Sequence, residues 1–237
     1  SVMKIWELEW KKINKKPFLR GIMGLAAFSL FIAMLFLFMP DEEMSRGDAM
    51  IIREWESLIV LVSCITLFGF AVLGAVIYVN AVFKEYQGKR SLLLFSYPIE
   101  RKRMFRAKAC LSGISIMAAA FIVNYLVLLA AGLTSNVFHI MPHSFGLAEM
   151  LELVIYSLAM AVLASGIGLI ALGIGMFRSS AMTVVIATLI IAGVMTNLFS
   201  ANMFTRIGIA IALVLVLAAG SVAFHQMEVR IKNMEVR

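Results

Sequence analysis

The sequence predicts an all-α membrane protein with six transmembrane helices and with both chain termini on the cytoplasmic side. Three observations predict this fold class. Hydrophobic residues make up 62% of the 237 residues and charged residues only 15%, too few for the polar surface of a soluble domain. The hydrophobic residues gather into six long runs. Eighteen of the 21 Lys and Arg residues fall on one side of these runs.

Each apolar run is long enough to cross about 30 Å of hydrocarbon as a helix, which takes about 20 residues. A helix is expected because it satisfies its own backbone hydrogen bonds inside lipid. No linker, low-complexity tract or internal repeat interrupts the pattern, so we expect a single transmembrane domain over residues 1–237. The six predicted spans are Phe18–Met39, Leu58–Phe83, Ala107–Leu133, Leu151–Met176, Ala181–Phe199 and Ile207–His225.

The basic residues set the predicted orientation. They gather before the first span, between the second and third spans, and in the tail at 227–237, whereas only Arg46, Arg53 and Arg206 fall on the other side. Cytoplasmic loops carry this excess, so both termini are predicted to be inside. The same rule explains the net charge of +7, and we therefore expect no nucleic-acid partner.

The segment before the first span has the pattern of a helix lying in the membrane plane. Trp6, Trp10 and Ile13 share one face of a helix over residues 3–17, and lysines occupy the other face. Indoles at the headgroups and lysines against anionic lipid are typical of interfacial helices. Pro17 then permits a turn into the first span. The alternative is an ordinary basic flank of that span.

Catalytic chemistry has no obvious place in this chain. The interiors of the predicted spans contain no Asp, Glu, Lys or Arg, and His139, His143 and His225 lie at span boundaries without zinc-site spacing. Residues 88–91 resemble the end of a phosphate-binding loop but lack its upstream glycine. We therefore predict no catalytic residue, no metal site, and no cofactor bound by this chain.

Two features inside the spans favour helix packing. Small residues recur three or four positions apart in the fourth span, which allows another helix to approach closely. Asn124 lies near the middle of the third span, where its amide either bonds a neighbouring helix or lines a conduit. The predicted packing seam consists of Ser157, Ala161, Ala164, Gly168, Ala171 and Gly175.

The cytoplasmic segment 84–106 is too long and too patterned for a simple turn. Residues 92–95 form an apolar run between charged ends, and Pro98 suits the first turn of a new helix. That helix is expected to carry Arg101, Arg103 and Lys108 directly into the third span.

In this segment the chain resembles the coupling-helix signature of type-2 ABC exporter permeases. That signature has a glutamate, a Gly-Thr or similar pair, a leucine run, Ser-x-Pro, and then Arg and Lys. Two departures are visible, because Ser91 replaces threonine and Lys89-Arg90 follows the glycine. The resemblance implies an ATPase-docking surface made of Lys84, Glu85, Tyr86, Gly88, Lys89, Arg90, Ser91, Leu92, Leu93, Leu94, Phe95, Pro98 and Arg101.

The same resemblance implies one half of a transporter in the bacterial cytoplasmic membrane. Its expected partners are an ABC ATP-binding subunit, which would hold ATP and Mg, and a second permease copy or a sister permease. The expected cargo is hydrophobic or amphipathic, such as a peptide, toxin, antibiotic or lipid-like molecule. The short segment around Thr196–Thr205 departs from related permeases, which often place extra outer helices there. The alternative function is a non-transporting immunity or scaffold protein in the membrane.

Overall fold

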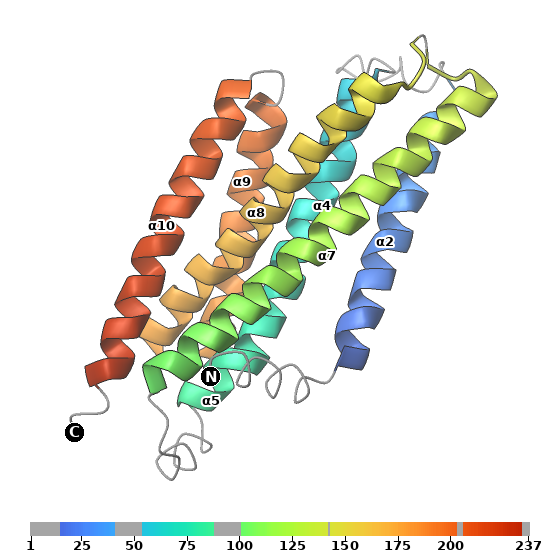
Figure 1. Cartoon of the computed structure of the whole chain (residues 1–237). Helices are drawn as coiled ribbons and strands as arrows, with labels where there is room; N and C mark the ends of the chain where they lie inside the picture. The colour runs from blue at the N-terminus through green and yellow to red at the C-terminus, as the bar shows by residue number, and fades with distance from the viewer. Residues whose placement is uncertain (1–14, 41–53, 88–100, 142, 203–205, 234–237) are drawn as a thin grey trace.

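The computed structural model describes residues 15–40, 54–87, 101–141, 143–202 and 206–233 of the chain, and within them every regular element is a helix. Six helices are long and apolar enough to cross a membrane (Figure 1). The second continues through a π-helical segment, η1, into the short helix α5. The elements are α2 (Lys15–Phe38), α4 (Trp55–Tyr78), η1 (Val79–Phe83), α5 (Lys84–Gln87), α7 (Arg101–Phe138), α8 (Leu147–Arg178), α9 (Ala181–Asn202) and α10 (Arg206–Asn233).

The six predicted spans each fall on one of these helices, but several predicted ends were wrong. The third span was predicted as Ala107–Leu133, whereas α7 runs from Arg101 to Phe138. Its 38 residues measure about 57 Å at 1.5 Å per residue, well beyond the hydrocarbon thickness. Likewise α10 continues to Asn233, into the segment assigned to the tail. Hydropathy marks the part of a helix that suits lipid, not the residue where its backbone hydrogen bonds end.

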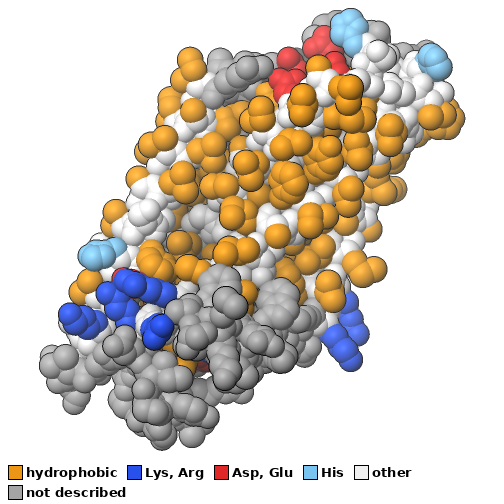
Figure 2. Space-filling view, viewed as in Figure 1, with side chains coloured by type: hydrophobic (Ala, Val, Ile, Leu, Met, Phe, Trp, Pro, Cys, Tyr) orange, Lys and Arg blue, Asp and Glu red, His pale blue; other side chains and the backbone are white. Residues whose placement is uncertain are grey.

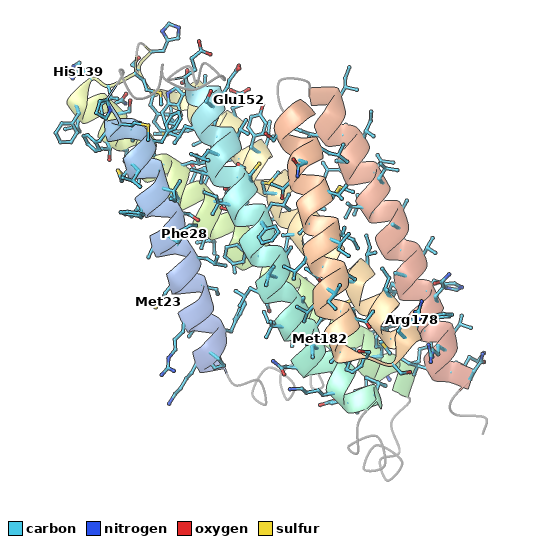
Figure 3. The ribbon with its side chains drawn as sticks, turned by 180° about the vertical axis from the view of Figure 1, so that it is seen from behind. Met23, Phe28, His139, Glu152, Arg178 and Met182 are labelled. Atoms are coloured by element: carbon cyan, nitrogen blue, oxygen red, sulfur yellow. The ribbon has the colours of Figure 1, made fainter. Side chains whose placement is uncertain are left out.

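Helix α8 occupies the centre of the bundle. It packs against α4, α7, α9 and α10, whereas α2 packs on α4 and α7 at one edge. Half of the most apolar stretch of α4 and of α8 is buried, compared with 11% for α10 at the other edge. Met23 and Phe28 point away from the bundle on the outer face of α2 (Figure 3), where both side chains are exposed. Such exposed apolar faces suit contact with lipid.

The two ends of the bundle differ in charge (Figure 2). Lys and Arg side chains gather where α2 and α7 begin and where α8 and α10 end, which we call the basic end. Arg178 lies there, whereas His139 and Glu152 lie at the opposite end (Figure 3). Arg206, at the start of α10, is the one described Lys or Arg position away from the basic end. The Lys and Arg residues of the described helices thus lie mainly at one end of the bundle, as the positions of the predicted spans had implied.

The predicted interfacial helix at 3–17 lies outside the described residues except for its last three. These three already belong to α2, and Pro17 falls in its first turn. An N–H in the first turn has no partner within its helix, so proline costs nothing there. The predicted docking residues between 88 and 100 also lie outside the described residues.

Candidate functional site

The segment leading into residues 88–100 is a direct continuation of the second span. Helix α4 widens into the π-helical η1 and then tightens again into α5. Such π-helical turns are rare and often occur at functional sites. Lys84, exposed at the start of α5, donates a hydrogen bond of 2.7 Å to Asn80 Oδ1 one turn earlier. The start of the segment is thus rigidly connected to the bundle.

Glu85 forms an ion pair with Lys108 of α7. The Lys108 side chain is only 5% exposed and the Glu85 side chain is 27% exposed. Removing a charged ammonium from water is costly unless a carboxylate compensates it, so this pair fixes α5 against α7. Glu85 was predicted from the sequence to lie on a surface that contacts an ATPase. Its carboxylate contacts a lysine of its own chain, and the docking role stays a prediction.

Aromatic rings fill the space between α5, α7 and α10. The Phe105 ring is fully buried, with the Tyr86 ring centroid at 5.8 Å on one side and the Phe224 centroid at 5.5 Å on the other. Edge-on and offset pairs at these separations are favourable. Tyr86, also assigned to docking, is therefore buried, and its ring is not part of the outer surface.

A second ionic cluster joins the start of α7 to the end of α10. Arg106 donates to both carboxylate oxygens of Glu228, through Nε to Oε1 and through an Nη at 3.0 Å to Oε2. Lys102 Nζ lies 3.5 Å from Glu228 Oε2. A bidentate Arg–carboxylate pair is among the stronger and more directional polar contacts in proteins. Glu228 was not predicted as a site residue, because its partner Arg106 lies 122 positions away in the sequence. The available signal was an acidic residue directly between Met227 and Val229.

The two clusters fix both ends of segment 88–100 to the bundle. Glu85 and Tyr86 precede the segment, and Phe105, Arg106 and Lys108 follow it on one unbroken helix. Lys84 and Arg103 are exposed next to the segment, and the exposed Arg106 and partly exposed Lys102 pair with Glu228. Of the predicted docking residues, Arg101 begins α7, and those outside the described residues are Gly88, Lys89, Arg90, Ser91, Leu92, Leu93, Leu94, Phe95 and Pro98.

The small residues predicted as a seam all lie buried inside the bundle, and their partners are now visible. A Cβ at Gly168 would lie 2.8 Å from the ring of Tyr78 on α4. The hydroxyl of Tyr78 in turn lies 3.5 Å from Ser165 Oγ, which donates to Gly113 O at 3.1 Å. The seam therefore lets α4, α7 and α8 meet closely. The buried seam residues are Ser157, Ala161, Ala164, Gly168, Ala171 and Gly175.

A second small-residue face on α8 was not predicted. A Cβ at Gly173 would lie 3.0 Å from Ala223 Cβ of α10, and a Cβ at Gly166 would overlap the side chain of Val216. These two glycines are seven residues apart, a spacing that places them on one face of the helix. That spacing could have indicated the α10 contact. From the sequence, only the more regular seam was predicted to be a helix-packing face.

Asn124 lies fully buried where α4, α7 and α8 meet. Its Nδ2 donates to Ser157 Oγ at 3.0 Å and to Ser63 Oγ at 3.5 Å. Hydrogen bonds between side chains of different helices hold spans together in lipid. Of the two roles considered for Asn124, this geometry favours helix packing over the lining of a conduit.

The described residues hold no group of three or more His, Cys, Asp or Glu that could bind a metal ion. An open groove at the end of α2 is lined by apolar residues that include Phe31, Phe38 and Pro40. These residues carry no polar side chain with which to orient a reactant. The polar chemistry of the described chain is thus concentrated at the basic end.

Comparisons with known proteins agree with this architecture. A family model described as ABC-2 family transporter protein matches residues 5–197, more than half of the chain. The chain is also 25% identical over 191 residues to the uncharacterized protein YcbO of Bacillus subtilis (strain 168), an alignment that covers 80% of this chain and 81% of YcbO. No solved structure matches the chain significantly. With six helices able to span a membrane and a family match over most of its length, the chain belongs to the ABC-2 family of transporter proteins.

Proposed function

We propose that the chain is the permease subunit of an ATP-driven ABC exporter in the bacterial cytoplasmic membrane. The observation that carries the proposal is a set of two ion pairs beside segment 88–100. Glu85–Lys108 joins the helix before the segment to the helix after it, and Arg106–Glu228 ties the helix after it to α10. When a partner subunit displaces a segment that is fixed at both ends, the displacement is transmitted to the helices that hold the segment. This is the property that a coupling element requires when a partner closes and opens beneath it.

The proposed orientation places the basic end in the cytoplasm. Lys or Arg lie at the starts of α2 and α7 and at the ends of α8 and α10. In contrast, Glu54, Glu56, Glu149 and Glu152 lie at or near the starts of α4 and α8 at the opposite end. Positive charge is retained on the cytoplasmic side during insertion. Segment 88–100 would then face the compartment that contains ATP.

ATP and Mg would be bound by a separate ATP-binding subunit. The family is a membrane component of transporters, and the segment 88–100 supplies an apolar run, Leu92–Phe95, suited to burial in a groove of a partner. A complete transporter would contain two permeases, either two copies of this chain or this chain with a sister. Lys84 and Arg103, exposed beside the segment, would add charge complementarity with an acidic groove.

The proposed cargo is hydrophobic or amphipathic and moves out of the cell. The polar side chains buried in the middle of the described spans are uncharged, and they include Ser63, Thr66, Asn124 and Ser157. The interior of the described spans thus offers no fixed charge to pair with an ionic cargo. A peptide, toxin, antibiotic or lipid-like molecule fits this interior.

The test is the ATPase activity of an ATP-binding subunit, encoded beside this chain, when both are reconstituted in lipid. Leu93→Asp would place a carboxylate in the proposed apolar contact with the ATP-binding subunit. Arg103→Glu would reverse an exposed charge beside segment 88–100. Both variants should insert normally, yet lose the bound subunit or its stimulated activity. Arg178→Glu, at the same end but at the last residue of α8, is the matched control and should retain both.

Equal stimulation by Leu93→Asp, Arg103→Glu and the parent would contradict docking through this segment. Failure of the parent to bind any ATP-binding subunit would contradict the exporter itself. Glu85→Arg is not a clean test, because it would also leave Lys108 buried without its carboxylate.

A further inference from the structure

The described part of the chain buries two charged side chains, Lys108 and Glu228. Lys108 pairs with Glu85, and this pair joins the two ends of segment 84–108, which we call the coupling region. Glu228 lies on α10, a helix that the coupling region does not include. A carboxylate that is only 5% exposed needs compensating charges, and it receives them from Arg106 and Lys102 of α7. The strongest polar contact of α10 is therefore made to the helix that leaves the coupling region.

Apolar contacts reinforce the same junction. Phe224, one turn before Glu228, packs on the buried ring of Phe105, and Met227 and Ile231 are buried in the same cluster. The start of α7 and the end of α10 lie side by side at the basic end (Figure 1). An ion pair over an apolar base fixes the relative position of two helices more firmly than either contact alone.

The rest of α10 is held differently. Along α8, Gly166 accommodates Val216 and Gly173 accommodates Ala223, and Leu169 of α8 faces Gly220 of α10. Only 11% of its most apolar stretch is buried. Smooth, closely packed helix faces can slide past one another by small amounts, the shear type of movement. Helix α10 is thus tied to α7 by charge at its end, whereas along α8 it is held by apolar contacts at glycines.

We propose that Glu228 is a positioning residue that makes α10 move with the coupling region, an inference that rests on the proposed function. When the ATP-binding subunit displaces segment 84–108, Arg106 and Lys102 carry Glu228 and the end of α10 with them. Helix α10 then shifts along the glycine-containing face of α8. The movement at the cytoplasmic surface is thereby delivered to a helix at the edge of the bundle.

The test measures distances between spin labels in lipid nanodiscs, with Cys64 and Cys110 replaced by alanine. One pair, Arg103→Cys with Asn233→Cys, spans α7 and α10, and a second, Arg178→Cys with Asn233→Cys, spans α8 and α10. Glu228→Gln keeps the shape of the side chain and removes its charge. Glu228→Asp retains the charge and should behave like the parent, and Lys232→Gln is the matched control on the same helix.

For the permease alone, we expect a narrow α7–α10 distance distribution in the parent, the control and Glu228→Asp, and a broadened one in Glu228→Gln. In the complex with its ATPase, ATP should shift the α8–α10 distance in the parent, and Glu228→Gln should lose that shift. An unchanged α7–α10 distance distribution in Glu228→Gln would overturn the inference that Glu228 holds α10 to α7. A retained ATP-dependent shift in that variant would overturn its role in transmission.

These outcomes separate this inference from the proposed function. If no ATP-binding subunit responds to the parent, the exporter proposal fails and the transmission fails with it. The label distances in the isolated permease would still decide whether Glu228 holds α7 to α10.

Discussion

At the scale of single residues, the buried polar and small side chains decide how closely the helices meet. Asn124 stood out in the sequence as an amide in the middle of an apolar run, and Gly168 as one of six small residues spaced three or four positions apart. Their partners could not be predicted, because Ser63, Ser157 and Tyr78 are ordinary residues far away in the sequence. The ion pair between Arg106 and Glu228 escaped prediction for the same reason. Local patterns identify which residues need a partner, and only the fold supplies it.

Gly168→Leu should destabilise the bundle, because a Cβ there would already lie 2.8 Å from the Tyr78 ring. Overpacking of this kind costs about 1–3 kcal/mol. The melting temperature in detergent should fall by several degrees, as measured by thermal unfolding of the purified protein. Gly24→Leu is the matched control, since nothing lies within 4 Å of a Cβ at that exposed position. Equal melting temperatures for the two variants would place the seam against lipid instead of α4.

Asn124→Leu should lower stability by about 1 kcal/mol through the loss of its interhelical hydrogen bonds. A double-mutant cycle with Ser157→Ala should give a coupling energy of about 0.5–1.5 kcal/mol, because the two side chains bond at 3.0 Å. Unfolding in a denaturing detergent measures it. Strictly additive effects would show that Asn124 does not hold α7 to α8 through Ser157.

At the scale of helices, the existence of all six spans was predicted, but their ends were not. Apolar runs of about 20 residues report the stretch that suits lipid. Polar residues such as Arg103 and Asn233 continue the same backbone hydrogen bonding outside it, so α7 and α10 are longer than predicted. Capping geometry marks the true ends. Ser179 ends α8 in the left-handed region at φ 55°, and Ser180 Oγ accepts a hydrogen bond from the Thr183 N–H at the start of α9.

Adjacent serines at this connection should therefore respond in opposite directions. Ser179→Gly relieves a left-handed conformation that costs a side chain about 1 kcal/mol, and it should raise stability by about that amount or less. Ser180→Ala removes the cap of α9 and should lower stability by about 1 kcal/mol. Thermal unfolding of both variants against the parent provides the comparison. Loss of stability in Ser179→Gly would mean that the serine side chain itself is needed there.

At the scale of the whole molecule, the distribution of charge predicted a bundle with one basic end, and the helices are arranged that way (Figure 2). The family resemblance was carried by the motif at 84–108, and the family match now supports it over most of the chain. The sequence could not indicate that the end of α10 packs against the start of α7. That contact joins residues more than 120 positions apart, and no local pattern encodes it.

The most direct test of the central claim is photo-crosslinking in living cells from one position at each end of the bundle. A photoreactive amino acid replaces Arg103 at the basic end or His139 at the opposite end, where both side chains are exposed. If the basic end is cytoplasmic and docks an ATP-binding subunit, position 103 should yield an adduct that contains that subunit, and position 139 should yield none. An ATP-binding subunit captured only from position 139, or from neither position at equal expression, would contradict the account.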